Sequence, residues 1–342
     1  MRVVDLTKYY NMIDEMYDNL IEKRFNPNHD ARGRFTTGSG GSSGSGRKYG
    51  TTNTADALMQ IKNGTDNSLK DHMDGDGLLS PERERLHKAI IDDELRGKVP
   101  VDGQATLVML GGGPASGKSS ILSTKPEDID EHTVVINPDE VKERLPNYNE
   151  LSLKDENAST YFHEESSALA KRLSEVAYSE NLNVIYDGTG DGSVNSVMKK
   201  INQARDAGYA VQGKYVTVDV ENALERNEDR YLKDLAKGKP ARKVPEDVVR
   251  TTHRDVTDIL AVTAPQFDAG SELWDNRGSK GQQKLIATYG GGKGLTPVAG
   301  QEQAFLDFLS KGKLGINGFE KQPDGSYMPT TELVQDLNNR RH

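Results

Sequence analysis

One glycine-rich segment constrains the fold of this chain more than any other feature. Residues 107–120 read LVMLGGGPASGKSS, in which Gly112, Gly117, Lys118 and Ser119 fill the pattern G-x-x-x-x-G-K-[ST]. An apolar run precedes the pattern and a helix-compatible stretch follows it, which gives the order strand, loop, helix. In that order the glycines let backbone N–H groups turn toward phosphate oxygens, and the following helix adds a partial positive charge. The segment therefore predicts a nucleotide-binding loop inside an α/β domain.

The same pattern predicts which cofactors the loop binds and which residues bind them. We expect Lys118 to reach the β- and γ-phosphates and the Ser119 hydroxyl to bind Mg²⁺. The chain has no N-K-x-D guanine signature, which favours ATP or loose selection of the base. The predicted cofactors are thus ATP and Mg²⁺, and the predicted nucleotide-binding residues are Gly112, Gly113, Pro114, Ala115, Ser116, Gly117, Lys118, Ser119 and Ser120.

Apolar runs and helical patterns alternate from Val101 onward, which is typical of crossover units and a parallel sheet. The expected fold is an α/β P-loop domain, with a parallel sheet flanked by helices, over residues 96–292. The helical patterns lie near 169–177 and 194–201, and the apolar runs are Thr106–Leu110, Thr133–Ile136, Asn183–Tyr186, Lys214–Val218 and Lys284–Thr288.

The remaining segments are more polar, and 34 glycines with only 34% apolar residues indicate that part of the chain packs no core. We expect a mostly helical and flexible N-terminal arm. Its parts are a helix (3–23) and turn segment over 1–37, a Gly/Ser linker at 38–46, and a polar lead-in at 47–95 with a helix from Pro81 to Leu95 that Ser80 begins. Residues 293–342 are expected to form one helix near 301–309 and a polar tail.

Composition excludes several classes of protein. No run of about 18 apolar residues exists, so no membrane span is expected. The absence of cysteine excludes disulfide scaffolds and thiol catalysis, and the N-terminus lacks the apolar core of a signal peptide, so a cytoplasmic protein is expected. The net charge of -9 argues against a general nucleic-acid binder.

Two aspartates follow apolar runs. Asp139 comes after TVVIN, about where small-molecule kinases place a carboxylate beside the acceptor hydroxyl, and it would take the proton of that hydroxyl. The alternative is a helix cap for residues 140–145. Asp187 ends the third run and is a candidate to support magnesium, with simple turn chemistry as its alternative.

Basic residues follow these carboxylates. Arg226 and Arg230 share a helical face, and Arg242 lies in the loop GKPARKVP. A P-loop kinase needs positive charge over the γ-phosphate, which a helix and loop of this kind supply. A solvated surface is the alternative.

The ordered set of motifs resembles the zeta toxin family of P-loop kinases over residues 105–290, about half of the chain. The resemblance is carried by GGPASGKS at 112–119, VINPD at 135–139, HEESS at 163–167, DGTG at 187–190 and ARKVP at 241–245. It implies an ATP-dependent kinase whose acceptor is UDP-N-acetylglucosamine, or another small molecule with a hydroxyl group. It also implies Asp139 as the base, Arg230 and Arg242 as phosphate clamps, and Glu165, Thr189 and Asp187 in the sugar-nucleotide pocket.

For the glutamate that the resemblance implies, position favours Glu165 over Glu164, because Glu165 shares a helical stripe with Leu169, Leu173 and Val176. The alternative is an acid that complements the helix dipole. The resemblance leaves open an antitoxin partner. NPNHDARGRFTTGSG, near the N-terminus, is also similar to segments of tailed-phage head proteins, so the alternative function is a virion-associated or interaction protein that binds nucleotide.

Overall fold

The computed structural model describes residues 68–124, 130–155, 158–190, 193–278, 282–290 and 294–339. The expected helix at 3–23, the Gly/Ser linker at 38–46 and the first part of the lead-in lie outside these ranges. Within them, no helix is long and apolar enough to cross a bilayer.

A seven-stranded sheet forms the centre of the molecule, in the order β2-β3-β1-β4-β5-β6-β7. The first five of these pair in parallel, which confirms the expected parallel sheet. Their bounds are β2 (Val134–Ile136), β3 (Val184–Asp187), β1 (Thr106–Gly111), β4 (Ala210–Thr217) and β5 (Ser271–Asp275). Because β1 lies between β3 and β4, its carboxyl end is a topological switch point, where open α/β sheets bind their ligands.

The far edge of the sheet differs from the expectation. The run at 284–288 forms β6 (Lys284–Tyr289), but β6 pairs antiparallel with β5, as β7 (Thr296–Pro297) does with β6. The sequence pattern missed β5 itself. Leu273 and Trp274 are its only large apolar residues, and the polar residues around them resemble a turn.

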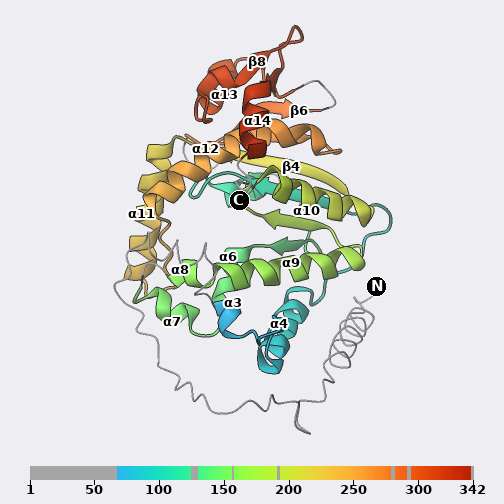
Figure 1. Ribbon diagram of the computed structural model, residues 1–342, viewed down its shortest axis with the longest axis vertical. Coiled ribbons are helices and arrows are strands. Elements are labelled where there is room, and N and C mark those ends of the chain that lie inside the picture. The colour runs from blue at the N-terminus through green and yellow to red at the C-terminus, as the bar shows by residue number, and fades with distance from the viewer. Residues whose placement is uncertain are drawn as a thin grey trace.

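Helices cover the sheet and share one large core with it (Figure 1). Between β1 and β5 in the sequence, the described helices are α5 (Lys118–Thr124), α6 (Pro138–Glu143), α7 (Tyr148–Ser152), α8 (Ala158–Tyr161), α9 (His163–Ser179), α10 (Val194–Asp206), α11 (Val220–Ala236), α12 (Glu246–Thr263) and the 3₁₀ turn Ala264–Gln266. The buried stripe of α9, which includes Leu169, Leu173 and Val176, packs into this core.

The lead-in forms part of the same body. Helices α3 (Ser68–Asp71) and α4 (Pro81–Glu94) pack against α9, as Figure 1 shows. Helix α4 begins as expected, because the Ser80 hydroxyl accepts a hydrogen bond from the Arg83 N–H at 3.2 Å and Pro81 stands in its first turn. Ile90 and Ile91 of α4 are buried in the core.

The C-terminal residues are more structured than the expected helix and polar tail. They form α13 (Glu302–Ser310), the 3₁₀ turn Gly315–Gly318, the hairpin β8 (Phe319–Lys321) and β9 (Tyr327–Pro329), and α14 (Thr331–Asn339). These elements gather at one end of the molecule, over α12 (Figure 1). The side chains of Phe305, Phe308 and Leu333 are buried there. Although this segment is polar on average, α13 and α14 each present one apolar face, and these faces form a core.

Candidate functional site

The glycine-rich loop joins β1 to α5 at the switch point. Gly112 has φ +139° and Gly117 has φ +90°, values that side chains rarely adopt. A Cβ on Gly112 would lie 2.4 Å from the Val216 carbonyl oxygen, so the loop also needs glycine there for close packing. Lys118 begins α5, and its Nζ donates to the Gly112 carbonyl at 3.1 Å. The loop therefore adopts the curled form in which backbone N–H groups can surround an anion.

Two residues outside the glycine motif hold this loop in place, His253 and Asn276. On α12, His253 is buried, and its Nε2 lies 3.0 Å from the Pro114 carbonyl oxygen. Burial lowers the pKa of His253 to about 4, so the ring is neutral at pH 7 and donates from Nε2. After β5, Asn276 donates from Nδ2 to the Ser116 carbonyl at 2.8 Å. The sequence gives no signal for His253, whereas the turn at 275–277 is a candidate to touch nucleotide, with a structural role as its alternative.

Asp187 and Thr189 lie beside the loop at the carboxyl end of β3. The Thr189 carbonyl accepts the Gly112 N–H at 2.8 Å. Burial raises the pKa of Asp187, and the positive charge of Lys118 opposes that shift. Asn137 donates to Asp187 Oδ2 at 3.5 Å, so the second and third strand ends also meet here.

The oxygen donors at this edge fit a magnesium ion. Mg²⁺ takes oxygen ligands and usually binds through one or two protein groups together with substrate phosphates. Ser119 is exposed in the first turn of α5 and offers a hydroxyl, and Asp187 offers a carboxylate whose charged form a cation would favour. The described residues form no group of three or more His, Asp or Glu side chains that could hold a metal ion.

Asp139 lies in the first turn of α6 but does not cap it. The cap is Asn137, whose Oδ1 accepts the Asp139 N–H at 3.0 Å. The Asp139 carboxylate is 42% exposed and binds two cations, Lys142 Nζ at 2.9 Å from Oδ1 and Arg242 at Oδ2. Asn137 and not Asp139 therefore caps α6, and the Asp139 side chain takes part in ion pairs with Lys142 and Arg242.

The three basic candidates have different surroundings. Arg226 donates to the Asn276 carbonyl at 3.0 Å, so it supports the strand-end loop. Arg230, one turn later on α11, has a buried guanidinium nitrogen without a hydrogen-bond partner among the described residues, and burial lowers its pKa. Arg242 comes from the loop between α11 and α12, and burial lowers its pKa to about 10, so it stays charged.

Glu165 lies apart from this group, on the face of α9 that α4 covers. Its side chain is completely buried, and it binds Arg83 NH2 at 2.8 Å and His87 Nε2 at 2.9 Å. Burial alone would raise the pKa of Glu165, but the hydrogen bonds from Arg83 and His87 outweigh it and hold the pKa at about 2. In this structure no oxygen of Glu165 faces solvent.

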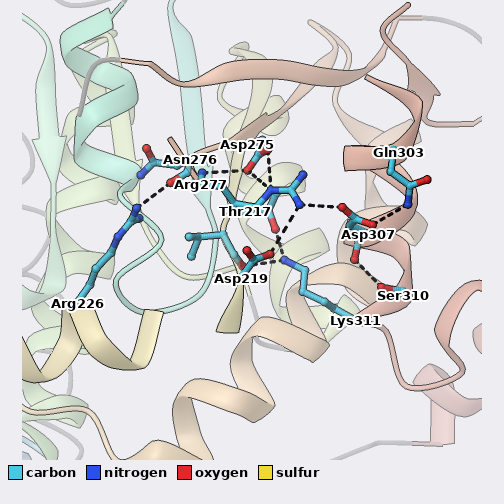
Figure 2. A network of polar contacts seen from close by, with 11 residues as sticks. Thr217, Asp219, Arg226, Asp275, Asn276, Arg277, Gln303, Asp307, Ser310 and Lys311 are labelled. Atoms are coloured by element: carbon cyan, nitrogen blue, oxygen red, sulfur yellow. Dashed lines mark hydrogen bonds and ion pairs between the residues drawn. The ribbon is translucent and has the colours of Figure 1, made fainter. Parts of the chain in front are cut away.

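A polar network ties the C-terminal elements to the nucleotide side of the sheet (Figure 2). Arg277 binds Asp275 at 2.9 Å and Asp307 of α13 at 2.7 Å. Lys311 is half-buried, and its Nζ donates to the Thr217 hydroxyl and, at 3.1 Å, to the Val218 carbonyl. Since Asn276 follows Asp275 and binds Ser116, α13 is connected to the glycine-rich loop through one strand end.

Comparison with known proteins gives one family. The zeta toxin family model matches residues 91–280, more than half of the chain. A toxin zeta of Streptococcus pyogenes is 27% identical over 168 residues, which are 46% of this chain and 56% of that toxin. A toxin zeta of Enterococcus hirae is also 27% identical, with the same coverage. The chain thus spans little more than half the length of these relatives.

Two solved structures have the same fold. A complex of AvrRxo1-ORF1 and AvrRxo1-ORF2 with ATP aligns with a TM-score of 0.52 and 19% identity, over 69% of this chain and 75% of that one. A structure from the PezAT toxin-antitoxin system of Streptococcus pneumoniae aligns with a TM-score of 0.51 and 16% identity, over 77% of this chain and 95% of that one.

Proposed function

The chain belongs to the zeta toxin family, and from its site we propose that it is a phosphotransferase that moves the γ-phosphate of ATP to a hydroxyl group of a small molecule. The observation that supports this best is a continuous path from Asp139 to the phosphate loop. The Asn137 side chain accepts a hydrogen bond from the Asp139 N–H and donates one to the Asp187 carboxylate. Burial raises the pKa of Asp187, and the positive charge of Lys118, in turn, opposes this rise. The candidate base and the nucleotide loop thus both lie at the carboxyl ends of neighbouring parallel strands.

The chemistry follows from these positions. The loop N–H groups and Lys118 would hold the phosphates, with Arg230 and Arg242 over the transferring group. Bound Mg²⁺, held by Ser119 and Asp187, would supply charge neutralisation. Asp139 would accept the proton of the acceptor hydroxyl while that oxygen bonds to the γ-phosphorus and the bond from that phosphorus to the β-phosphate oxygen breaks, which releases ADP.

UDP-N-acetylglucosamine is the acceptor that we propose, on the basis of family membership. Asp187 and Thr189 lie beside the phosphate loop, where an acceptor would border the γ-phosphate. Glu165 is placed differently, since a sugar contact by this carboxylate would require Arg83 and His87 to move off it. We therefore propose that Glu165 shapes the acceptor side by holding α4 against α9.

An antitoxin partner is part of the proposal, because one structure of the same fold comes from a toxin-antitoxin system. If the kinase activity is harmful, inducing the wild-type chain in a bacterial host would stop growth, and Asp139→Asn would not. Equal growth arrest by both chains would separate toxicity from phosphate transfer.

A transfer assay tests the reaction directly. Purified protein is mixed with Mg²⁺ and γ-labelled ATP, with and without UDP-N-acetylglucosamine, and the products are separated. We expect label on the sugar nucleotide with the wild-type chain, and a loss of at least about a hundredfold in rate with Asp139→Asn. Lys118→Ala should abolish transfer.

The matched control is Asp229→Asn, since Asp229 is an exposed acid on α11 whose bond is to Lys233. It should keep the wild-type rate. Label transfer that survives in Asp139→Asn would remove Asp139 from the role of base. ATP binding without label on the sugar nucleotide would leave the kinase intact and exclude this acceptor.

A further inference from the structure

Both carboxylate oxygens of Asp139 are occupied in the structure, Oδ1 by Lys142 and Oδ2 by Arg242. A general base needs an oxygen that can approach the acceptor hydroxyl. We propose that Arg242 is an exchangeable partner, which binds Asp139 until a nucleoside triphosphate arrives and then moves to the γ-phosphate, freeing Oδ2 for the proton. This inference rests on the proposed phosphotransfer, and it adds that the triphosphate must bind before Asp139 can act as the base.

Lys142 is the fixed partner in this arrangement. It stands three residues after Asp139 on α6, and its side chain is only 4% exposed. Its Nζ also donates to Ser159 at 3.1 Å, and Ser159 is buried on α8. Because two elements hold the ammonium group, Oδ1 keeps its partner when the other oxygen is released. Lys142 is thus a positioning residue for Asp139.

Arg242 has the opposite character. It belongs to the segment between α11, which ends at Ala236, and α12, which begins at Glu246, and no helix or strand fixes its backbone. Its side chain is 24% exposed, and the ion pair with Asp139 joins it to a carboxylate that is itself 42% exposed. A pair of this exposure has modest strength, whereas a phosphate offers a guanidinium several charged oxygens at once.

Arg230 indicates where the phosphate would be held. Its buried NH2 group lacks a hydrogen-bond partner among the described residues, and such a group costs free energy until an acceptor reaches it. The positive charge of Arg230 acts on the Tyr148 hydroxyl, and Tyr148 hydrogen-bonds to Ser159, the residue that also binds Lys142. Arg230 is thus linked to Asp139 through Tyr148, Ser159 and Lys142. In the proposed exchange the γ-phosphate binds Arg230 and draws Arg242 away from Asp139.

The exchange links the base to the nucleotide. Without a γ-phosphate, Arg242 stays on Oδ2, and its guanidinium group hinders the approach of the acceptor hydroxyl to that oxygen. With the triphosphate bound, Oδ2 takes the proton as the acceptor oxygen attacks, and Arg242 faces the charge on the transferring group. ADP has no γ-phosphate, so it should leave the Asp139 pair intact.

A double-mutant cycle on nucleotide affinity tests the exchange without any acceptor. The binding of the non-hydrolysable analogue AMP-PNP, with Mg²⁺, is measured by calorimetry for the wild-type chain, Asp139→Asn, Arg242→Gln and the double variant. In the wild-type background, Asp139→Asn releases Arg242 and should tighten binding about fivefold, the strength of one partly exposed ion pair. In the Arg242→Gln background the same change should give no gain, and ADP should show none in either.

A gain of equal size in both backgrounds would mean that Asp139 merely repels the phosphate, and it would overturn the exchange while leaving the proposed function standing. No gain in either background would also overturn it. Failure of the wild-type chain to bind AMP-PNP would overturn the proposed function as well. Asp139→Ala repeats the test without a side-chain oxygen, and Asp229→Asn and Arg250→Gln, at exposed ion pairs, serve as controls that should bind as the wild type does.

Discussion

The ammonium nitrogen of Lys142 lies 2.9 Å from Asp139 Oδ1, one helical turn away, with its side chain almost fully buried. Burial lowers the pKa of Lys142 to about 8, so the ion pair with Asp139 depends on pH. Below that value the charge that orients the carboxylate is present, and above it the charge is lost. The pair therefore links the candidate base to the pH of the solution.

From this pair we expect transfer to slow as pH rises through about 8 in the wild-type chain. Lys142→Arg should keep its charge and move this alkaline limb upward, because a guanidinium stays protonated. The loss of activity at alkaline pH would be measured from initial rates between pH 6.5 and 10, at saturating ATP. Lys154→Arg, at an exposed pair with Glu150, is the control and should follow the wild type. An identical limb in wild type and Lys142→Arg would assign the titration to another group.

Glu165 offers a test of structure against substrate binding. Glu165→Gln leaves Arg83 buried without its counter-charge, and breaking a buried pair in this way costs about 3–5 kcal/mol. Urea unfolding at pH 7 should show this loss. Because the folded pKa is about 2, the stabilisation by Glu165 should be present above its ordinary value of 4.5 and should fade as pH drops toward 2.

The comparison for that variant is Glu164→Gln, at the neighbouring position on the same helix turn, which should leave the unfolding free energy nearly unchanged. If Glu165→Gln instead unfolded like the wild type and lost only transfer activity, Glu165 would be a substrate ligand and not the anchor of α4.

Much of this fold could be predicted because its signals are local. The glycine pattern and the apolar runs around it predict β1, the loop and the parallel strands β2, β3 and β4, and Ser80 with Pro81 marks the start of α4. The partners of the site could not be predicted, because each contact joins distant parts of the chain. His253 reaches Pro114 across 139 positions, and Arg83 reaches Glu165 across 82. The buried stripe that suggested Glu165 indicated burial correctly, but it could not say that arginine and histidine fill the space.

His253 should make folding sensitive to mild acid. Its folded pKa of about 4 lies below its ordinary value of 6.5, so the unfolded chain binds the proton more readily. Stability should be full above pH 6.5 and should fall as pH drops from 6.5 toward 4. His253→Gln should flatten that part of the profile, measured by urea unfolding at several pH values. His132→Gln, at a partly exposed histidine, is the control, and a profile as steep in His253→Gln as in the wild type would contradict the assignment.

Lys311 tests whether the C-terminal elements support the nucleotide loop. Its ammonium group satisfies the Thr217 hydroxyl and the Val218 carbonyl at the end of β4, next to the strand end that carries Asn276 and its bond to Ser116. Lys311→Met keeps the length of the side chain but leaves these acceptors without their donor, at a cost of about 1–3 kcal/mol. We expect lower stability together with a several-fold weaker affinity for AMP-PNP, measured by calorimetry below the unfolding transition.

Lys313→Met removes an exposed bond to Asp336 in the same segment and should change neither quantity by much. Loss of stability with unchanged nucleotide affinity would limit Lys311 to packing, whereas loss of both would make residues beyond 293 part of the nucleotide site.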